Sequence, residues 1–195
     1  GSRDKNYNKY CSRVCCMYSL KFAHLILDKL PETEVFEYFI DMRSFGKGYE
    51  EFYERVQEEG ITMVRGRGAE VDVLENGKLR VKGEDANLGK LVAADVDMVV
   101  LSTAVQAPQD AGKVASLFGL SRSPDGFFAE AHPKLRPFNT NTDGIFLAGT
   151  CQAPRDIPDT VAHANAAAAE AMSLMGRGRV VIEPTIAEID AEMCS

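Results

Sequence analysis

Apolar residues at helical spacing alternate with short apolar runs along the first half of the chain. This alternation limits the chain to an α/β fold, because helices that separate strands pack against the faces of a sheet. The pair Asn76-Gly77 adds a strong hairpin signal. The predicted elements are helices over residues 12–29 and 49–59, strands over 35–40 and 61–64, a hairpin over 70–81, and a strand over 96–102 that is expected to be buried because most of its residues are apolar.

The character of the sequence changes after Pro108. A short helix is predicted over 111–118, and a loop rich in proline, arginine and asparagine follows it. Residues 144–147 predict one more buried strand, and an alanine-rich helix is predicted over 160–175, ended by Gly176. We therefore divide the chain into a first part, 1–108, a second part, 109–180, and a linker, 181–195.

Charge and cysteine usage exclude several classes of protein. The net charge of −7, with no basic stripe, argues against a nucleic-acid partner. No apolar run reaches the roughly 18 residues that a membrane span needs, and no secretory signal is visible. The five cysteines have no paired spacing. We therefore expect a reducing, cytoplasmic setting and no disulfide framework.

Three of these cysteines, Cys11, Cys15 and Cys16, form a C-x3-C-C cluster at the start of the first predicted helix. Thiolates at this density suit a soft metal centre such as zinc, copper(I) or an iron–sulfur cluster. The alternative is three buried or free thiols at a helix start. Lys21 lies just past one helical turn beyond Cys16, at the same end of the helix. The other two cysteines, Cys151 and Cys194, stand apart.

A second candidate site is the turn Ala148-Gly149-Thr150, which precedes a helix expected to start near Asp159 or Thr160. Backbone N–H groups at such a helix start favour anions, including an anionic flavin ring edge. The alternative is an ordinary strand-to-helix connection with an Asp or Thr cap. Elsewhere the sequence lacks a G-x-G-x-x-G fingerprint, so Asp41 is interpreted as a solvated strand end. The three histidines are scattered, and His24 is interpreted as a core residue.

Four blocks of the sequence resemble the A subunit of heterodisulfide reductase, the flavin and iron–sulfur subunit of methanogens with relatives in sulfate reducers. They are residues 10–21, 40–46, 130–137 and 149–165, and the similarity spans essentially the whole chain. The core of this family is similar to thioredoxin reductase, an FAD domain interrupted by a nicotinamide-domain-like insert.

The resemblance implies an internal fragment with a particular fold. Residues 1–108 would be a nicotinamide-domain-like, Rossmann-type α/β unit whose first strand is missing. Residues 109–180 would be the C-terminal part of a split FAD-binding domain, and 181–195 a linker toward a ferredoxin-type domain. An incomplete domain exposes apolar surface, so we expect self-association.

The resemblance also implies site residues. Three of four ligands of a [4Fe–4S] cluster would be Cys11, Cys15 and Cys16, with the fourth a cysteine shortly upstream. Lys21 would lie near the reactive edge of the flavin, as a catalytic residue. The fragment lacks the fourth thiolate and the FAD-phosphate fingerprint, so both cofactors are expected to be absent or weakly bound. The second FAD motif of the family matches Gly149, Thr150, Asp159, Thr160 and Val161.

The implied function is electron transfer in the reduction of a heterodisulfide of the CoM-S-S-CoB type, with the flavin splitting electron pairs (bifurcation). Ferredoxin and the other subunits of the complex would be the partners. One alternative is an NAD(P)H-dependent flavin disulfide reductase of the thioredoxin-reductase type. That enzyme needs a glycine-rich phosphate turn before the first helix, where this chain has cysteines. The other alternative is a non-enzymatic, zinc-stabilised scaffold.

Overall fold

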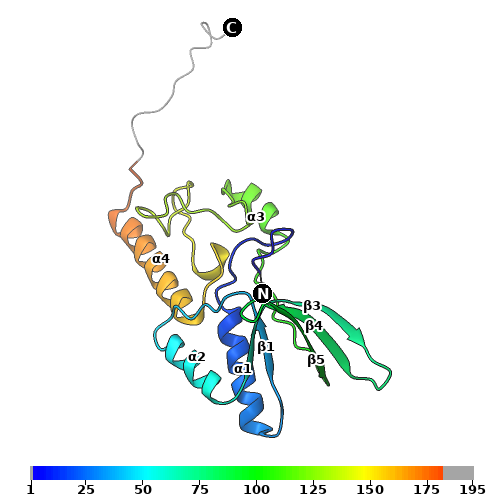
Figure 1. Ribbon diagram of the computed structural model, residues 1–195. Coiled ribbons are helices and arrows are strands. Elements are labelled where there is room, and N and C mark those ends of the chain that lie inside the picture. Colours follow the sequence, from blue (N-terminus) through cyan, green and yellow to red (C-terminus); the bar gives the residue numbers. More distant parts are fainter. Residues whose placement is uncertain (1, 182–195) are drawn as a thin grey trace, which may run out of the picture. The chain divides into compact units, whose positions relative to one another are not determined.

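The chain has a mixed α/β structure, as the alternation of apolar segments predicts. The computed structural model describes residues 2–181 and combines helices with one parallel and one antiparallel sheet (Figure 1). The chain divides into two compact units. The first unit is formed by Gly1–Gln106 and Pro154–Asp156, and the second unit by Ala107–Ala153 and Ile157–Ser195. The assignment of these parts to nicotinamide-like and FAD-binding domains stays a prediction.

The first unit begins with a helix–strand–helix–strand run. Helix α1 (Cys15–Lys29) leads to strand β1 (Phe36–Phe39), and helix α2 (Tyr49–Glu58) leads to strand β2 (Thr62–Arg65). The two strands pair in parallel along their full length. Parallel neighbours need a long crossover connection, and α2 with its flanking loops supplies it. All four elements fall within a few residues of their predicted bounds.

Three antiparallel strands follow and form a second sheet, in the order β3 (Gly68–Val73), β4 (Leu79–Asp85) and β5 (Lys90–Val96). The turn between β3 and β4 contains Gly77 at φ +82°, a conformation that L side chains rarely adopt. The side-chain oxygen of Asn76 accepts a backbone N–H two residues further on at 3.0 Å. The hairpin predicted from Asn76-Gly77 is confirmed.

The core of the first unit lies where α1 meets α2 and the start of β2. Leu20 of α1 and Val56 of α2 have no exposed surface, and Ala23 lies one turn beyond Leu20 on the same face of α1. Ile61, just before β2, completes the buried cluster. Partly buried side chains surround it: Met17, Leu27, Val35, Met42, Phe52, Tyr53 and Met63.

The second unit contains two helices and long irregular connections. Helix α3 (Ala111–Phe118) ends at Gly119, whose φ is +65°. A single 3₁₀ turn, η1 (Gly149–Cys151), precedes helix α4 (Ile157–Arg177). None of the helices in the part of the chain that the structure describes has the length and apolarity to cross a bilayer. The predicted linker 181–195 lies, apart from its first residue, outside the described residues.

The strand predicted over 96–102 is wrong. Strand β5 ends at Val96, and the segment after it has no regular structure. Met98, Val100 and Leu101 are 75%, 65% and 77% exposed. No strand among the described residues pairs with this segment, so its backbone lacks the hydrogen-bond partners that a buried strand requires. Strand β5 itself escaped prediction because its small and charged residues weaken the apolar pattern.

The strand predicted over 144–147 is also wrong. Only a single bridge forms there, between Phe146 and Asn139. Gly144 has φ +85°, outside the strand region, and the Thr140 hydroxyl donates to the Ile145 carbonyl at 3.0 Å. Helix α4 is longer than predicted, because Pro158 is tolerated in its first turn and Gly176 does not end it.

Replacing Leu20 with Ala should lower the free energy of unfolding by about 2–5 kcal/mol, because Leu20 is fully buried and the deletion leaves a cavity between α1 and α2. Chemical denaturation followed by circular dichroism measures the change. Leu91→Ala is the control, since Leu91 is 88% exposed and should shift the midpoint little. Equal effects of the two variants would contradict this description of the core.

Candidate functional site

The cysteine cluster lies in a tight loop that leads into α1. Arg13 has φ +64°, the left-handed region, and its backbone N–H donates to Cys11 Sγ at 3.3 Å. The Val14 N–H donates to the Ser12 carbonyl at 2.8 Å. Helix α1 then starts at Cys15 with no side-chain cap. The loop therefore places the three thiols at a helix N-terminus, where the partial positive charge of the helix favours thiolates.

Polar side chains attach this loop and α1 to residues 102–105 of the same unit. The Tyr10 hydroxyl donates to the Val105 carbonyl at 2.7 Å, and the Val105 N–H donates to the hydroxyl of Ser12 at 3.0 Å. Tyr18 donates to the Thr103 carbonyl at 2.8 Å, and the Ser19 hydroxyl contacts that of Ser102. Ser12 has no exposed surface. Residues 102–105, which are distant in the sequence, thus hold the cysteine loop in place.

Two of the three thiols are in hydrogen-bond contact. The Cys16 thiol donates to Cys15, and this bond lowers the pKa of Cys15 from 9.0 to about 6. The same contact raises the pKa of Cys16, and burial adds to the effect. Cys16 Sγ also lies 3.9 Å from the Asp41 carbonyl. At neutral pH the pair therefore holds one thiolate, on Cys15, and one thiol, on Cys16.

Acidic groups border the thiols. Burial raises the pKa of Glu37, on β1, to about 7, and the negative charge of Cys15 adds to the shift. Asp41, which follows β1, pairs with Arg3 and, at 3.5 Å, with Arg43. The carboxylate of Asp41 is therefore paired with two guanidinium groups. The sequence had suggested a residue at a strand end that contacts only solvent.

The donor set suits a soft metal, but no complete ligand set is assembled. Within residues 2–181, no group of three or more His, Cys, Asp and Glu side chains is arranged to hold a metal ion. Cys15 and Cys16 are in direct contact, and Cys11 Sγ accepts the Arg13 N–H. All three are half-buried and free of disulfides. Thiolates at a helix start fit an iron–sulfur centre. Because the described residues supply no complete ligand set, the assignment of the three cysteines as ligands stays a prediction.

In the second unit, Gly149 and Thr160 of the predicted flavin motif come together. Gly149 is buried at φ +70°, and a Cβ there would lie 3.0 Å from Thr160 Cγ2. The Gly149 N–H donates to His163 Nδ1 at 2.9 Å, and the ring of Phe138 packs edge-on against that of His163, with the centroids 4.9 Å apart. This backbone N–H is therefore engaged by His163, so other N–H groups of the turn would have to serve an anionic ligand.

The remaining predicted residues are placed as follows. Thr150 and Val161 are exposed, and Asp159 lies half-buried in the first turn of α4. Lys21 is exposed on α1 and makes no hydrogen bond or ion pair with the described residues. Cys151 donates to the Ala148 carbonyl at 3.2 Å, within the turn. Cys194 lies outside the described residues.

Sequence reasoning missed two residues that the structure brings into these sites, and it misjudged the burial of a third residue, His24, outside them. His163 is buried beside Gly149, and only its position three residues after Thr160 on one helix face could have indicated this. Glu37 lies within an apolar strand, which is a signal for an unusual carboxyl. His24, interpreted from the sequence as a core residue, bonds the Glu59 carboxylate at 2.7 Å and is only half-buried.

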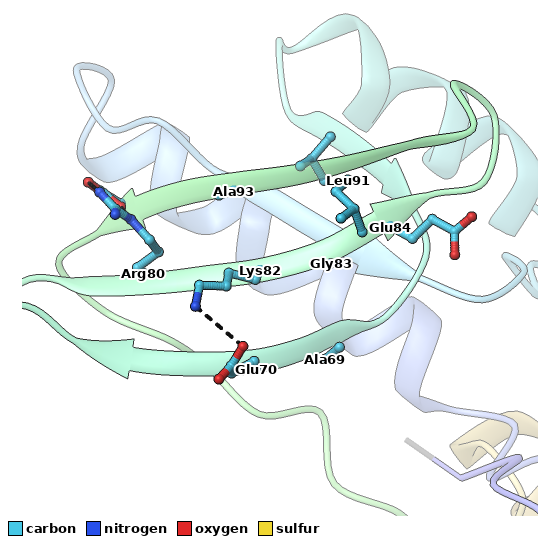
Figure 2. Close-up of a pocket in the computed structure, with 10 residues that line it drawn as sticks. Ala69, Glu70, Arg80, Lys82, Gly83, Glu84, Leu91 and Ala93 are labelled. Carbon is cyan, nitrogen blue, oxygen red and sulfur yellow. Dashed lines mark hydrogen bonds and ion pairs between the residues drawn. The ribbon is translucent and has the colours of Figure 1, made fainter.

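A hollow that neither predicted site includes lies on one face of the β3–β4–β5 sheet (Figure 2). It is an open groove of about 900 Å³. Four of its charged side chains form two pairs: Arg80 binds Asp95 through two bonds of 2.6 Å, and Lys82 lies 3.3 Å from Glu70. Neither the cysteines nor Gly149 line this groove.

Comparison with known proteins finds relatives of the chain among methanogen proteins. It is 52% identical over 197 residues to an iron–sulfur A subunit of CoB–CoM heterodisulfide reductase from Methanopyrus kandleri. It is 54% identical over 198 residues to the A subunit of the H(2):CoB-CoM heterodisulfide,ferredoxin reductase of Methanothermobacter thermautotrophicus. It is 47% identical over 197 residues to the A subunit of the H(2)/formate:CoB-CoM heterodisulfide,ferredoxin reductase of Methanococcus maripaludis. No family model matches the chain.

These alignments cover 100% of the chain and 30% of each relative. The chain is therefore homologous along its whole length to the A subunits of heterodisulfide reductases and spans about 30% of the length of these proteins. The resemblance inferred from the four sequence blocks is confirmed.

The alkylation rate of Cys15 should rise with an inflection near pH 6, while Cys16 stays unreactive up to pH 8, because the Cys16 thiol stabilises the Cys15 thiolate. Iodoacetamide labelling of the metal-free chain at several pH values, followed by peptide mass spectrometry, gives both profiles. Cys16→Ala should move the Cys15 inflection to higher pH, whereas the control Cys151→Ala should not. An inflection that is the same in the Cys16 variant would contradict the paired-thiol description.

Replacing Glu37 with Gln should stabilise the chain at pH 8 by roughly 3 kcal/mol. The folded pKa of Glu37, about 7, lies above the ordinary 4.5, so the folded state holds the proton more tightly and stability falls as pH rises from 4.5 to 7. The Gln side chain avoids this loss, and the two proteins should converge below pH 4.5. Denaturation at pH 4, 6 and 8 tests this, with exposed Glu51→Gln as the control.

Proposed function

We propose that this chain is a cofactor-holding segment of a heterodisulfide reductase, from its flavin and iron–sulfur subunit, since it is homologous to such subunits along its whole length. The observation that carries the proposal is identity of about half of all residues to proteins named for CoB–CoM heterodisulfide reduction. In the full-length protein the activity would be that of an oxidoreductase acting on a sulfur group.

The cysteine loop would hold a [4Fe–4S] cluster through Cys11, Cys15 and Cys16, with a fourth thiolate from another part of the full-length protein. Three features support this assignment. The thiols are concentrated at a helix start, Cys15 is a thiolate near neutral pH, and the relatives include a subunit named as iron–sulfur. When bound, the cluster supplies one-electron transfer. The three cysteines would bind the cluster, and Ser12, which is buried in the same loop, holds them in position.

The turn at Gly149 would hold part of an FAD. The close approach of Gly149 to Thr160 brings the 3₁₀ turn against the start of α4, where Asp159 and Val161 also lie, with Thr150 in the turn itself. Helix N-termini favour anionic groups, which suits a reduced, anionic flavin edge. Lys21 is proposed as a cation near that edge in the full-length protein, and its exposure leaves its ammonium group accessible.

In this proposal the flavin divides electron pairs between ferredoxin and the disulfide-reducing part of the complex. The partners are the other subunits of the reductase and ferredoxin, both of which fit the names of the relatives. The protein contributes cofactor binding and electrostatics, and the redox chemistry belongs to the cofactors. Self-association through exposed apolar residues, Met98 and Leu101 among them, is part of the same proposal.

Replacing Cys15 with Ser in the full-length protein should remove about four iron atoms, one cluster, together with its paramagnetic signal, because an alcohol binds iron far more weakly than a thiolate. FAD content should stay unchanged. Iron analysis and electron paramagnetic resonance measure these quantities.

The matched control is Cys151→Ser, which should keep all of its iron, because Cys151 bonds within its own turn. A Cys15 variant with full iron content would refute the cluster assignment. Zinc in place of iron, in a colourless protein, would support the zinc-stabilised scaffold instead.

A further inference from the structure

A histidine lies on the buried face of helix α4. The buried residues of this helix are His163 and Ala167, one turn apart on the same face. His163 is only 5% exposed. Imidazole is the side chain whose charge changes near neutral pH, so a ring that can gain a charge occupies a position where an apolar residue is the usual choice.

The hydrogen bond between Gly149 and His163 fixes the place of the proton on the imidazole. A backbone N–H can only donate, so Nδ1 of His163, 2.9 Å from the Gly149 nitrogen, must be the acceptor. An accepting Nδ1 carries no proton, and the proton of the neutral ring is therefore on Nε2. The ring of Phe138 packs edge-on against the imidazole, with the centroids 4.9 Å apart, and opposes its rotation.

This bond connects the first residue of η1 to α4. Gly149 begins a single 3₁₀ turn, so its N–H has no acceptor within the turn itself. The other end of the turn is held by a different contact, in which the Phe128 N–H donates to the Cys151 carbonyl at 3.0 Å. The bond to His163 is therefore the polar contact that keeps the start of the turn against α4.

A protonated imidazole cannot accept this bond. Both nitrogens of the imidazolium carry a hydrogen, so the Nδ1–H of His163 would meet the N–H of Gly149, donor against donor. The bond is consequently present above the pH at which the ring titrates, and it is lost as the pH falls through that value.

Charged and titratable groups also lie on the elements that pack against His163: Asp159, Glu170 and Arg177 on α4, Cys151 in η1, and Arg136 near Phe138. Glu170 and Arg136 are bonded to other side chains. Asp159 lies one turn before His163 on the same face of α4, so its carboxylate is the one that a protonated ring would approach. Movement of the ring in that direction would take the acceptor away from Gly149.

We infer that His163 is a positioning residue for the turn at Gly149 and acts only as the neutral imidazole, an inference that rests on the proposed function of this turn. With a neutral ring, the bond holds Gly149 against α4, and the N–H groups at the helix start stay arranged for an anionic flavin edge. With a protonated ring, the turn is released, so acid weakens the retention of FAD.

Two substitutions separate the acceptor from the ring. His163→Asn keeps an acceptor at the position of Nδ1 but has no group that titrates. His163→Phe keeps an aromatic ring against Phe138 but offers no acceptor to Gly149. The matched control is His132→Asn, because His132 lies in the same unit and its Nδ1 also accepts backbone N–H groups, at 3.1 and 3.2 Å.

The first measurement is hydrogen exchange of the Gly149 amide in the cofactor-free chain, followed by NMR from pH 8 to pH 4.5 together with the titration of the imidazoles. In the wild type and in His132→Asn, the protection factor should fall about tenfold as His163 becomes protonated, because a buried donor loses its acceptor. It should stay constant in His163→Asn and be low at every pH in His163→Phe.

The wild-type titration decides the question even where a variant does not fold. Protection of Gly149 that persists beside a protonated His163 overturns the inference, as does a ring that stays neutral down to pH 4.5. A fall of protection in His163→Asn equal to that in the wild type also overturns it.

The second measurement is the rate of FAD release from the full-length protein at pH 8, followed by flavin fluorescence. His163→Phe should release FAD about tenfold faster than the wild type, the effect of one lost buried hydrogen bond, and His163→Asn should release it at nearly the wild-type rate. Equal rates in the wild type and in His163→Phe overturn the positioning role. A full-length protein without FAD overturns the proposed function instead, and the exchange data still decide whether His163 holds the turn.

Discussion

The hydrogen bond between the Ser12 hydroxyl and the Val105 amide is the contact on which the cysteine site depends. Ser12 is fully buried, so its hydroxyl must be bonded within the protein. The bond joins positions 93 residues apart in the sequence. Arg13 and the start of α1 follow directly after Ser12. Without this bond the Ser12 hydroxyl would keep only its contact with the Ser2 hydroxyl, at 2.9 Å, and the turn that orients the thiols would lose part of its support.

The charges around the thiols favour a bound positive centre. A thiolate on Cys15, a thiol on Cys16 and the carboxyl of Glu37 share a partly buried region, and the charge on Cys15 makes ionisation of the other two more costly. Asp41 nearby is neutralised by arginines. Such a region concentrates acidic groups that repel one another once they are ionised. The iron of a bound cluster would relieve that repulsion, which supports the proposed cluster over three inert thiols.

In the second unit the turn at Gly149 is stabilised in a different way. At Gly149 the absence of a side chain permits a close approach to Thr160, and the buried His163 accepts the backbone N–H that the turn would otherwise leave without a partner. The imidazole therefore stabilises the turn, and the groups left to face a ligand are those at the start of α4.

Much of this protein was determined by sequence alone. The helices, the strands β1 and β2 and the Asn76-Gly77 hairpin follow from local periodicity and turn chemistry, and the family from four blocks of residues. Tertiary structure decided the rest. The apolar run after Val96 looks like a buried strand, but a strand needs a neighbour, and no local pattern encodes that neighbour. The bond of Ser12 to Val105, the contact of Gly149 with His163 and the altered acidity of Cys15 and Glu37 likewise depend on which groups meet after folding, because hydrogen bonds and burial act between residues distant in sequence.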